Sequence, residues 1–125
     1  MNGPLGIIVV DHGSRRAESN ASLREIVRWC CEQSPDSIIE PAHMELTEPT
    51  ISQAFDRCVA RGARTVVVHP YVLAPGRHGH EDIPRLAADA AAQHPEVAYR
   101  VTEPLGPHPL LAAIICERVR ESLEI

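Results

Sequence analysis

Four apolar runs, each followed by a segment with helical periodicity, constrain the fold of this sequence more than any other feature. Residues 5–10 are continuously apolar, which is typical of a strand buried on both faces of a parallel sheet. Further strands are predicted over residues 38–44, 65–68 and 97–101, and the last is more polar, so we place it at a sheet edge. Strands that alternate with helices pair in parallel through right-handed crossovers. The sequence therefore predicts one domain over residues 1–125, a three-layer α/β/α fold with about four parallel strands.

Apolar residues recur at helical spacing between and after these strands. The patterns fall at residues 23–30, 48–61, 83–90 and 111–123. Pro49 is expected in the first turn of the second helix, where its missing N–H costs nothing, and Gly62 is expected to end that helix. Glycine and proline between residues 75 and 80 predict a loop before the third helix.

The composition argues against several classes of function. The net charge is −5 and aromatic residues make up 3% of the chain, so neither a basic surface for nucleic acid nor a stacking platform for single strands is expected. No run approaches the roughly 18 apolar residues that span a membrane, and the N-terminus lacks the pattern of a signal peptide. We expect a cytoplasmic protein, or a stromal one in a plastid-bearing host, with no nucleic-acid or membrane partner.

The four cysteines form no CxxC pair, the spacing that a zinc site or a metal cluster would favour. Cys30, Cys58 and Cys116 fall on the apolar faces of predicted helices, where a reduced cysteine behaves as a small hydrophobic residue. We therefore expect reduced thiols with a structural role, not a disulfide framework.

Six of the seven histidines fall in the loops or strand ends at the edge of the sheet where the carboxyl ends of the strands meet. They are His12, His43, His69, His78, His80 and His108. Ligands of open parallel sheets bind at this edge. Imidazole groups and a carboxylate such as Glu45 suit a divalent metal such as Fe²⁺, Co²⁺ or Zn²⁺, and imidazole exchanges protons near neutral pH. Because the spacing matches no compact metal motif, only the fold can assemble such a site.

The segment after the first strand has the features of an anion site. Gly13 permits close approach of the backbone to a ligand, and Ser14 stands near the start of a helix whose free N–H groups attract anions. Arg15 and Arg16, together with Arg77, would supply charge for carboxylates or phosphates. The alternative is that these arginines are solvated surface residues. Neither a P-loop pattern nor a GxGxxG pattern follows a strand, so a nucleotide-binding fold is not indicated.

Several ordered motifs at these positions give the sequence a family resemblance. DHGSRR at residues 11–16, EPAHMEL at 40–46 and PGRH at 75–78 resemble the short sirohydrochlorin chelatases, the small class II chelatases of cobalamin and sirohaem synthesis. PLGPH at residues 104–108 is most similar to the sirohaem ferrochelatase branch of plants and related bacteria. The resemblance covers residues 7–119, and it implies a chelatase-like half-unit of flavodoxin-like shape that inserts Fe²⁺ or Co²⁺ into sirohydrochlorin.

The resemblance also implies which residues act. His12 and His78 would bind the metal and accept the pyrrole protons, and Glu45 would be their acidic partner at the metal. The metal would be a substrate, so no permanently bound cofactor is expected. The carboxylate arms of the tetrapyrrole need donors. The substrate-binding residues that we expect are Gly13, Ser14, Arg15, Arg16 and Arg77.

Short members of this family pair two subunits around one cleft, which implies a homodimer here. The plant proteins also carry a C-terminal extension with cysteines for an iron–sulfur cluster; this sequence ends at Ile125 without one, so we expect no cluster. The choice between Fe²⁺ and Co²⁺, the pathway, and the roles of the remaining histidines stay open. Those histidines are His43, His69, His80 and His108.

Two other functions remain open on the residues alone. A metal carrier or storage module without catalysis would use the same histidine-rich edge, and it would retain metal tightly without tetrapyrrole turnover. An interaction domain of flavodoxin-like shape would carry the histidines incidentally and would bind neither metal nor tetrapyrrole.

Overall fold

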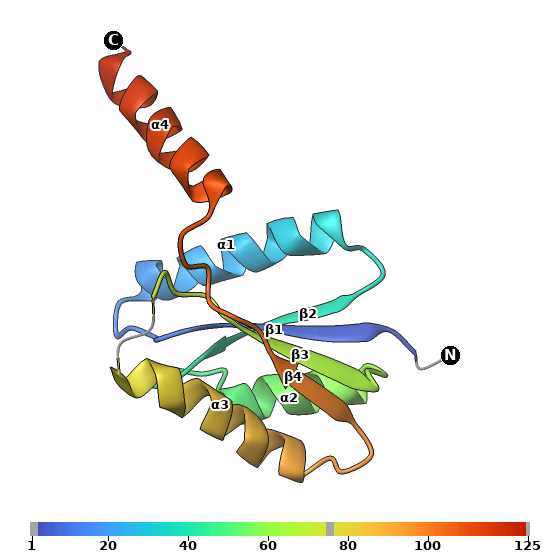
Figure 1. Cartoon of the computed structure of the whole chain (residues 1–125). Helices are drawn as coiled ribbons and strands as arrows, with labels where there is room; N and C mark the ends of the chain where they lie inside the picture. The colour runs from blue at the N-terminus through green and yellow to red at the C-terminus, as the bar shows by residue number, and fades with distance from the viewer. Residues whose placement is uncertain (1–2, 75–76, 125) are drawn as a thin grey trace.

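Strands and helices alternate along the whole chain in the computed structural model, which describes residues 3–74 and 77–124, with residues 77–80 described by their backbone alone (Figure 1). The elements are β1 (Leu5–Asp11), α1 (Ala17–Gln33), β2 (Ile38–His43), α2 (Ile51–Ala60), β3 (Thr65–Pro70), α3 (Arg77–Ala92), β4 (Ala98–Val101) and α4 (Pro109–Leu123). The alternation that the apolar runs predict is confirmed.

The four strands form one parallel sheet in the order β2-β1-β3-β4. β1 is therefore central, and its last residue, Asp11, lies in register with His43, the last residue of β2. β4 lies at one edge of the sheet, as its polar sequence predicts, and none of its four residues is fully buried. The order brings the segments after β1, β2 and β3 to adjacent positions along the carboxyl edge.

Helices cover both faces of the sheet, which confirms the three-layer α/β/α architecture (Figure 1). On one face, Leu23 and Val27 of α1 pack with Val9 and Ile39 of the strands. On the other face, α2 and α3 enclose the larger core cluster, in which Phe55 is fully buried. Burying apolar surface contributes about 25 cal/mol per Å², so this two-sided core is the main source of stability.

α2 begins at Ile51, not at the Glu48-Pro49 pair that the sequence pattern favours. The reason is a capping box: the Thr50 hydroxyl accepts from the backbone N–H of Gln53, whose side chain accepts from the backbone N–H of Thr50. These two bonds satisfy N–H groups that a helix start otherwise leaves unpaired. Pro49 therefore precedes the helix and does not occupy its first turn.

The loop predicted up to residue 80 is shorter than expected, because α3 already begins at Arg77. Glycine in a helix interior costs only about 1 kcal/mol relative to alanine. The burial of Ile83 and Ala87 against the sheet outweighs this cost. Tertiary packing thus overrides the local signal from Gly79.

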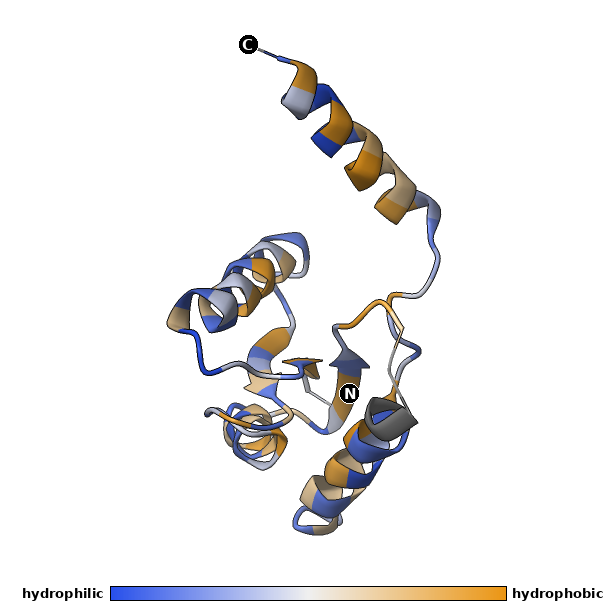
Figure 2. Cartoon of the chain, turned by 90° about the vertical axis from the view of Figure 1, so that its left-hand side faces the viewer, coloured by the Kyte–Doolittle hydropathy of each residue, from blue (hydrophilic) through white to orange (hydrophobic). Residues whose placement is uncertain are grey.

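The expected last helix forms as α4, but it buries none of its residues. It projects away from the sheet and from the other three helices (Figure 1), and hydrophobic residues recur along its ribbon (Figure 2). The exposed large apolar side chains of α4 are Leu110, Ile114, Ile115, Val119 and Leu123.

The cysteines are free, and their environments differ from one another. Cys58 is buried and Cys30 half-buried, as their positions on apolar helix faces predict, whereas Cys116 of α4 is exposed. Burial raises the pKa of the Cys58 thiol to about 12, with Glu40 adding to the rise and Arg61 opposing it. Among the described residues, no helix is both long and apolar enough to cross a membrane.

Candidate metal and tetrapyrrole site

The segments after β1 and β2 are joined backbone to backbone at the carboxyl edge of the sheet. The N–H of Met44 donates to the carbonyl oxygen of Asp11 at 2.8 Å, and the N–H of Glu45 donates to the carbonyl oxygen of His12 at 3.1 Å. The side chains of His12 and Glu45 are both exposed. Two of the predicted metal-binding residues therefore share one open edge, although 33 positions separate them in the sequence (45 − 12 = 33).

Gly13 makes this close approach possible. Its φ is +90°, in the region that L side chains rarely adopt, and a Cβ built on it would lie 2.0 Å from the carbonyl oxygen of Glu45. Glycine carries no Cβ, so the chain can turn here and the two loops can meet. The sequence predicts close approach at Gly13, and the structure shows that the neighbour is the Glu45 backbone.

A side-chain pair, the buried His43 and the partly exposed Asp11, joins the ends of β2 and β1 next to these loops. Nδ1 of His43 lies 2.6 Å from Oδ1 of Asp11, and the same oxygen accepts the backbone N–H of Gly13 at 3.0 Å. His43 is 1% exposed. The sequence places His43 at the correct edge and leaves its role open, and the structure makes it the hydrogen-bond partner of Asp11.

Asn20 of α1 organises the next part of the loop. Its side chain accepts from the N–H of Ser14 at 3.0 Å and donates to the carbonyl oxygen of Ser14 at 2.7 Å. No role for Asn20 is predicted from the sequence. The available signal was its position: Asn20, Leu23 and Val27 are the buried residues of α1 and follow one inward stripe, and a polar residue on such a stripe needs partners.

These contacts change the expected donors for anionic substrate groups. The N–H groups of Gly13 and Ser14 already donate to side chains, and the N–H of Arg16 donates to the hydroxyl oxygen of Ser14 at 3.0 Å. These N–H groups belong to the loop before α1, and the N-cap residue of α1, Arg16, makes no side-chain cap bond. The side chains of Arg15 and Arg16 are exposed at the same edge, so these two arginines supply positive charge there.

Arg77 and His78 form the start of α3, in the segment that follows β3. The positions of their side chains, and that of His80, lie outside the described residues. β3 lies next to β1 in the sheet order. The segment after β3 is therefore a third predicted segment at this end of the sheet. Among the side chains that the structure describes, no group of three or more metal-ligating residues lies together.

Two other histidines at this edge have partners within the chain. Nδ1 of His69 lies 2.7 Å from the Thr102 hydroxyl, and burial lowers the pKa of the His69 imidazole. The side chain of His108 caps α4, where Nδ1 accepts from the N–H of Leu110 at 3.0 Å. We therefore assign structural contacts to both histidines.

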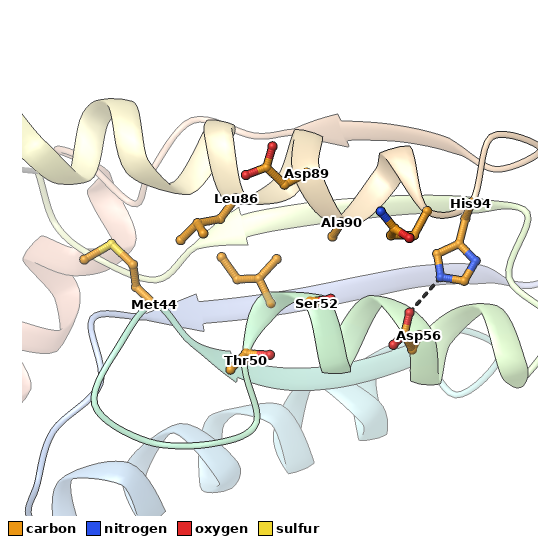
Figure 3. Close-up of a pocket in the computed structure, with 10 residues that line it drawn as sticks. Met44, Thr50, Ser52, Asp56, Leu86, Asp89, Ala90 and His94 are labelled. Atoms are coloured by element: carbon orange, nitrogen blue, oxygen red, sulfur yellow. Dashed lines mark hydrogen bonds and ion pairs between the residues drawn. The ribbon is translucent and has the colours of Figure 1, made fainter.

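A groove of about 680 Å³ lies between α2 and α3 (Figure 3). Met44 stands at one end of it, and Asp56 and His94 stand at the other, joined at 2.7 Å. None of the predicted site residues whose side chains the structure describes lines this groove. Met44, at one end of the groove, directly precedes Glu45, whereas Asp56 and His94 lie at the other end.

The fold and the edge together define a class: a parallel α/β protein that presents imidazole, carboxylate and guanidinium groups beyond the carboxyl ends of its strands. Comparison with known proteins identifies the family within that class. The CbiX family model matches residues 6–122, so this chain belongs to the CbiX family.

The relatives include a protein of about the same length as this chain and one of about twice that length. The chain is 53% identical over 118 residues to the chloroplastic sirohydrochlorin ferrochelatase of Arabidopsis thaliana, which covers 94% of this chain and 52% of the relative. It is 30% identical over 129 residues to a sirohydrochlorin cobaltochelatase of Methanococcoides burtonii, covering 97% and 98%. The chain thus spans about half the length of the plant relative and nearly all of the archaeal one.

A solved structure shares the fold. The sirohydrochlorin chelatase SirB of Bacillus subtilis subspecies spizizenii, crystallised in complex with cobalt, superposes with a TM-score of 0.81 at 28% identity. The match covers 94% of this chain and 50% of that one. The expected chelatase-like fold is confirmed.

Proposed function

We propose that this chain inserts a divalent metal, Fe²⁺ or Co²⁺, into sirohydrochlorin. The observation that carries the proposal is the backbone bond between His12 and Glu45, because it holds an imidazole and a carboxylate at one open edge. The relatives support the choice of substrate, since one is named for iron and the other for cobalt insertion into sirohydrochlorin.

The reaction exchanges two pyrrole protons for one metal ion. His12 and His78, as neutral imidazoles, bind the metal through nitrogen lone pairs and then accept the protons as the metal passes to the ring. Glu45 adds negative charge that attracts the cation. A site with two or three protein ligands leaves coordination positions open, which a metal that must leave requires.

The anionic arms of the tetrapyrrole need cationic partners at the same edge. Arg15 and Arg16 follow His12 by three and four residues and are exposed, and Arg77 precedes His78. Guanidinium groups bind carboxylates through paired hydrogen bonds. The net charge of −5 repels an anion, so these local charges must orient the substrate.

A second copy of the chain completes the enzyme as a homodimer. The exposed apolar residues of α4 leave a surface that water solvates poorly, and exposed apolar patches of this kind mark interaction sites. The SirB chelatase, of which this chain covers 50%, is long enough to hold two such domains in one chain. The free cysteines support a reducing compartment, the cytoplasm or the plastid stroma.

The test measures metal insertion by the absorbance change of sirohydrochlorin, with Fe²⁺ and Co²⁺ compared in parallel. His12→Ala and His78→Ala should each slow insertion by roughly 10²–10⁴-fold. His94→Gln is the matched control, because His94 lies in the α2–α3 groove, and it should leave the rate near that of the wild type. Equal rates in all four proteins would overturn the assigned roles, and stoichiometric metal retention without turnover would favour a carrier.

A further inference from the structure

The Asp11 carboxylate connects three parts of the site edge through one oxygen atom. Oδ1 lies 2.6 Å from Nδ1 of His43 and 3.0 Å from the backbone nitrogen of Gly13. Asp11 ends β1, and His43 ends β2. One side-chain oxygen therefore joins the end of the neighbouring strand to the residue that follows His12.

The hydrogen bonding of His43 defines how it can act. Nε2 of His43 is buried and has no hydrogen-bond partner among the described residues, so the only polar contact of the ring is the one with Asp11. Because a carboxylate oxygen accepts hydrogen bonds, Nδ1 carries the proton and donates it. Nε2 is buried, so among the described residues the ring is held by Asp11 alone.

The bonds of Asp11 restrain His12 from both sides. The residue before His12 is anchored to His43, and the residue after it is anchored to Asp11. The carbonyl oxygen of His12 itself accepts from the N–H of Glu45. The backbone at His12 is thus fixed at three consecutive residues, while its side chain remains exposed.

We propose that Asp11 and His43 are a positioning pair that holds the His12 imidazole toward the position of the metal beside Glu45. This inference rests on the proposed function. A metal that must pass from imidazole to a ring nitrogen depends on geometry, and misplacement by about 1 Å can cost roughly 10²-fold in rate. Neither Asp11 nor His43 touches the metal in this account; both act through the loop.

The experiment compares two substitutions that separate hydrogen bonding from packing. His43→Asn keeps an N–H donor in the place of Nδ1 and loses ring volume. His43→Leu fills more of the buried space and loses the donor. If His43 acts through packing alone, the kcat of the leucine variant should equal or exceed that of the asparagine variant. If His43 acts through positioning, the asparagine variant should have the higher kcat.

Two readouts are measured for wild type and both variants, with thermal unfolding as the check on folding. For Co²⁺ insertion into sirohydrochlorin, His43→Leu should lower kcat by about 10–100-fold with little change in KM for the tetrapyrrole, and His43→Asn should retain most of the wild-type kcat. Amide hydrogen exchange at Gly13, followed by NMR, should be faster only in His43→Leu, because the Asp11 acceptor is then no longer held in place.

The outcomes distinguish this inference from the proposed function. Wild-type protein that inserts no metal overturns the function, and Gly13 exchange then still tests the positioning pair. Equal Gly13 exchange in both variants, or a higher kcat for His43→Leu than for His43→Asn, overturns the pair. If His43→Leu fails to fold, Asp11→Ala removes the same acceptor at a partly exposed position and should give the same loss of kcat.

Discussion

The carbonyl oxygen of His12 accepts a hydrogen bond from the backbone N–H of Glu45, with an N···O distance of 3.1 Å. This bond extends the pairing of β1 and β2 beyond the last residues of the strands. It holds two loops in fixed relation at the edge where ligands of parallel sheets bind.

Gly13→Ala should separate the two loops. The new Cβ would lie 2.0 Å from the Glu45 carbonyl oxygen, at a φ of +90°, so strain and overpacking together should cost about 3 kcal/mol. Gly62→Ala is the matched control, because its φ is +106° and no atom lies within 4 Å of the added Cβ; it should cost about 1 kcal/mol. Urea unfolding measures both, and equal losses would contradict the crowding at Gly13.

Thr50→Ala should weaken the start of α2. The variant removes the hydroxyl that accepts the Gln53 N–H, and losing such a cap costs about 1 kcal/mol in free energy of unfolding. Thr50→Ser keeps the hydroxyl and should remain close to wild type. Chemical denaturation of the three proteins checks this, and a helix that truly began at Pro49 would show no difference between alanine and serine.

Thiol labelling should separate Cys58 from Cys31 in the native protein. Cys58 is buried and its pKa is raised to about 12, so at pH 8 almost none of it is the reactive thiolate. Cys31 is exposed and should react with a disulfide reagent within minutes. Peptide mapping after labelling identifies the modified residues. Rapid native labelling of Cys58 would show that the core between α2 and the sheet is open.

The stability of the protein should fall on mild acidification, in part through His69. Burial lowers the pKa of His69 from its ordinary 6.5. Below pH 6.5, His69 is therefore protonated to a greater extent in the unfolded chain than in the folded protein. Stability from this group is complete above pH 6.5 and decreases as the pH falls toward the lowered pKa. Unfolding of His69→Gln between pH 8 and pH 5 should show a shallower decline than wild type; identical slopes would refute this.

Ile115→Asp on α4 should convert a dimer into a monomer. The side chain is 63% exposed in the single chain, so the change should barely affect folding, yet a charge in an apolar interface is costly. Ala113→Asp adds the same charge on roughly the opposite side of the helix and should leave the dimer intact. Analytical ultracentrifugation over a range of concentrations distinguishes these outcomes. If the wild-type protein is monomeric at every concentration measured, the proposed dimer is wrong.

The element order could be predicted because buried strands and amphipathic helices leave different hydrophobic periods in the sequence. The limits of α2 could not, since the capping box of Thr50 and Gln53 competes with the proline signal at residue 49. The apolar stripe of α4 predicts a helix correctly. The stripe carries no information about what covers it, and no residue that the structure describes buries it.

The edge of the sheet that holds the candidate site could be predicted from the sequence. The contacts between the side chains at that edge could not. Strand ends rich in histidine indicate which side of the sheet carries chemistry. The contact between Asp11 and His43 depends on β2 lying beside β1 in one particular register, and neither the sheet order nor the register can be read from local patterns. Asn20 was missed for a different reason: its place on the inward stripe of α1 signals a buried polar group, but the stripe does not show that the partner is the Ser14 backbone.

Crystals of the wild-type protein soaked with Co²⁺, with anomalous scattering measured at the cobalt edge, test the central claim most directly. The account predicts one ion with an imidazole nitrogen of His12 at about 2.0–2.2 Å, the range of metal–imidazole bonds, and with the Glu45 carboxylate beside it. An ion bound instead by Asp56 and His94 in the α2–α3 groove, with no density near His12, would contradict the account.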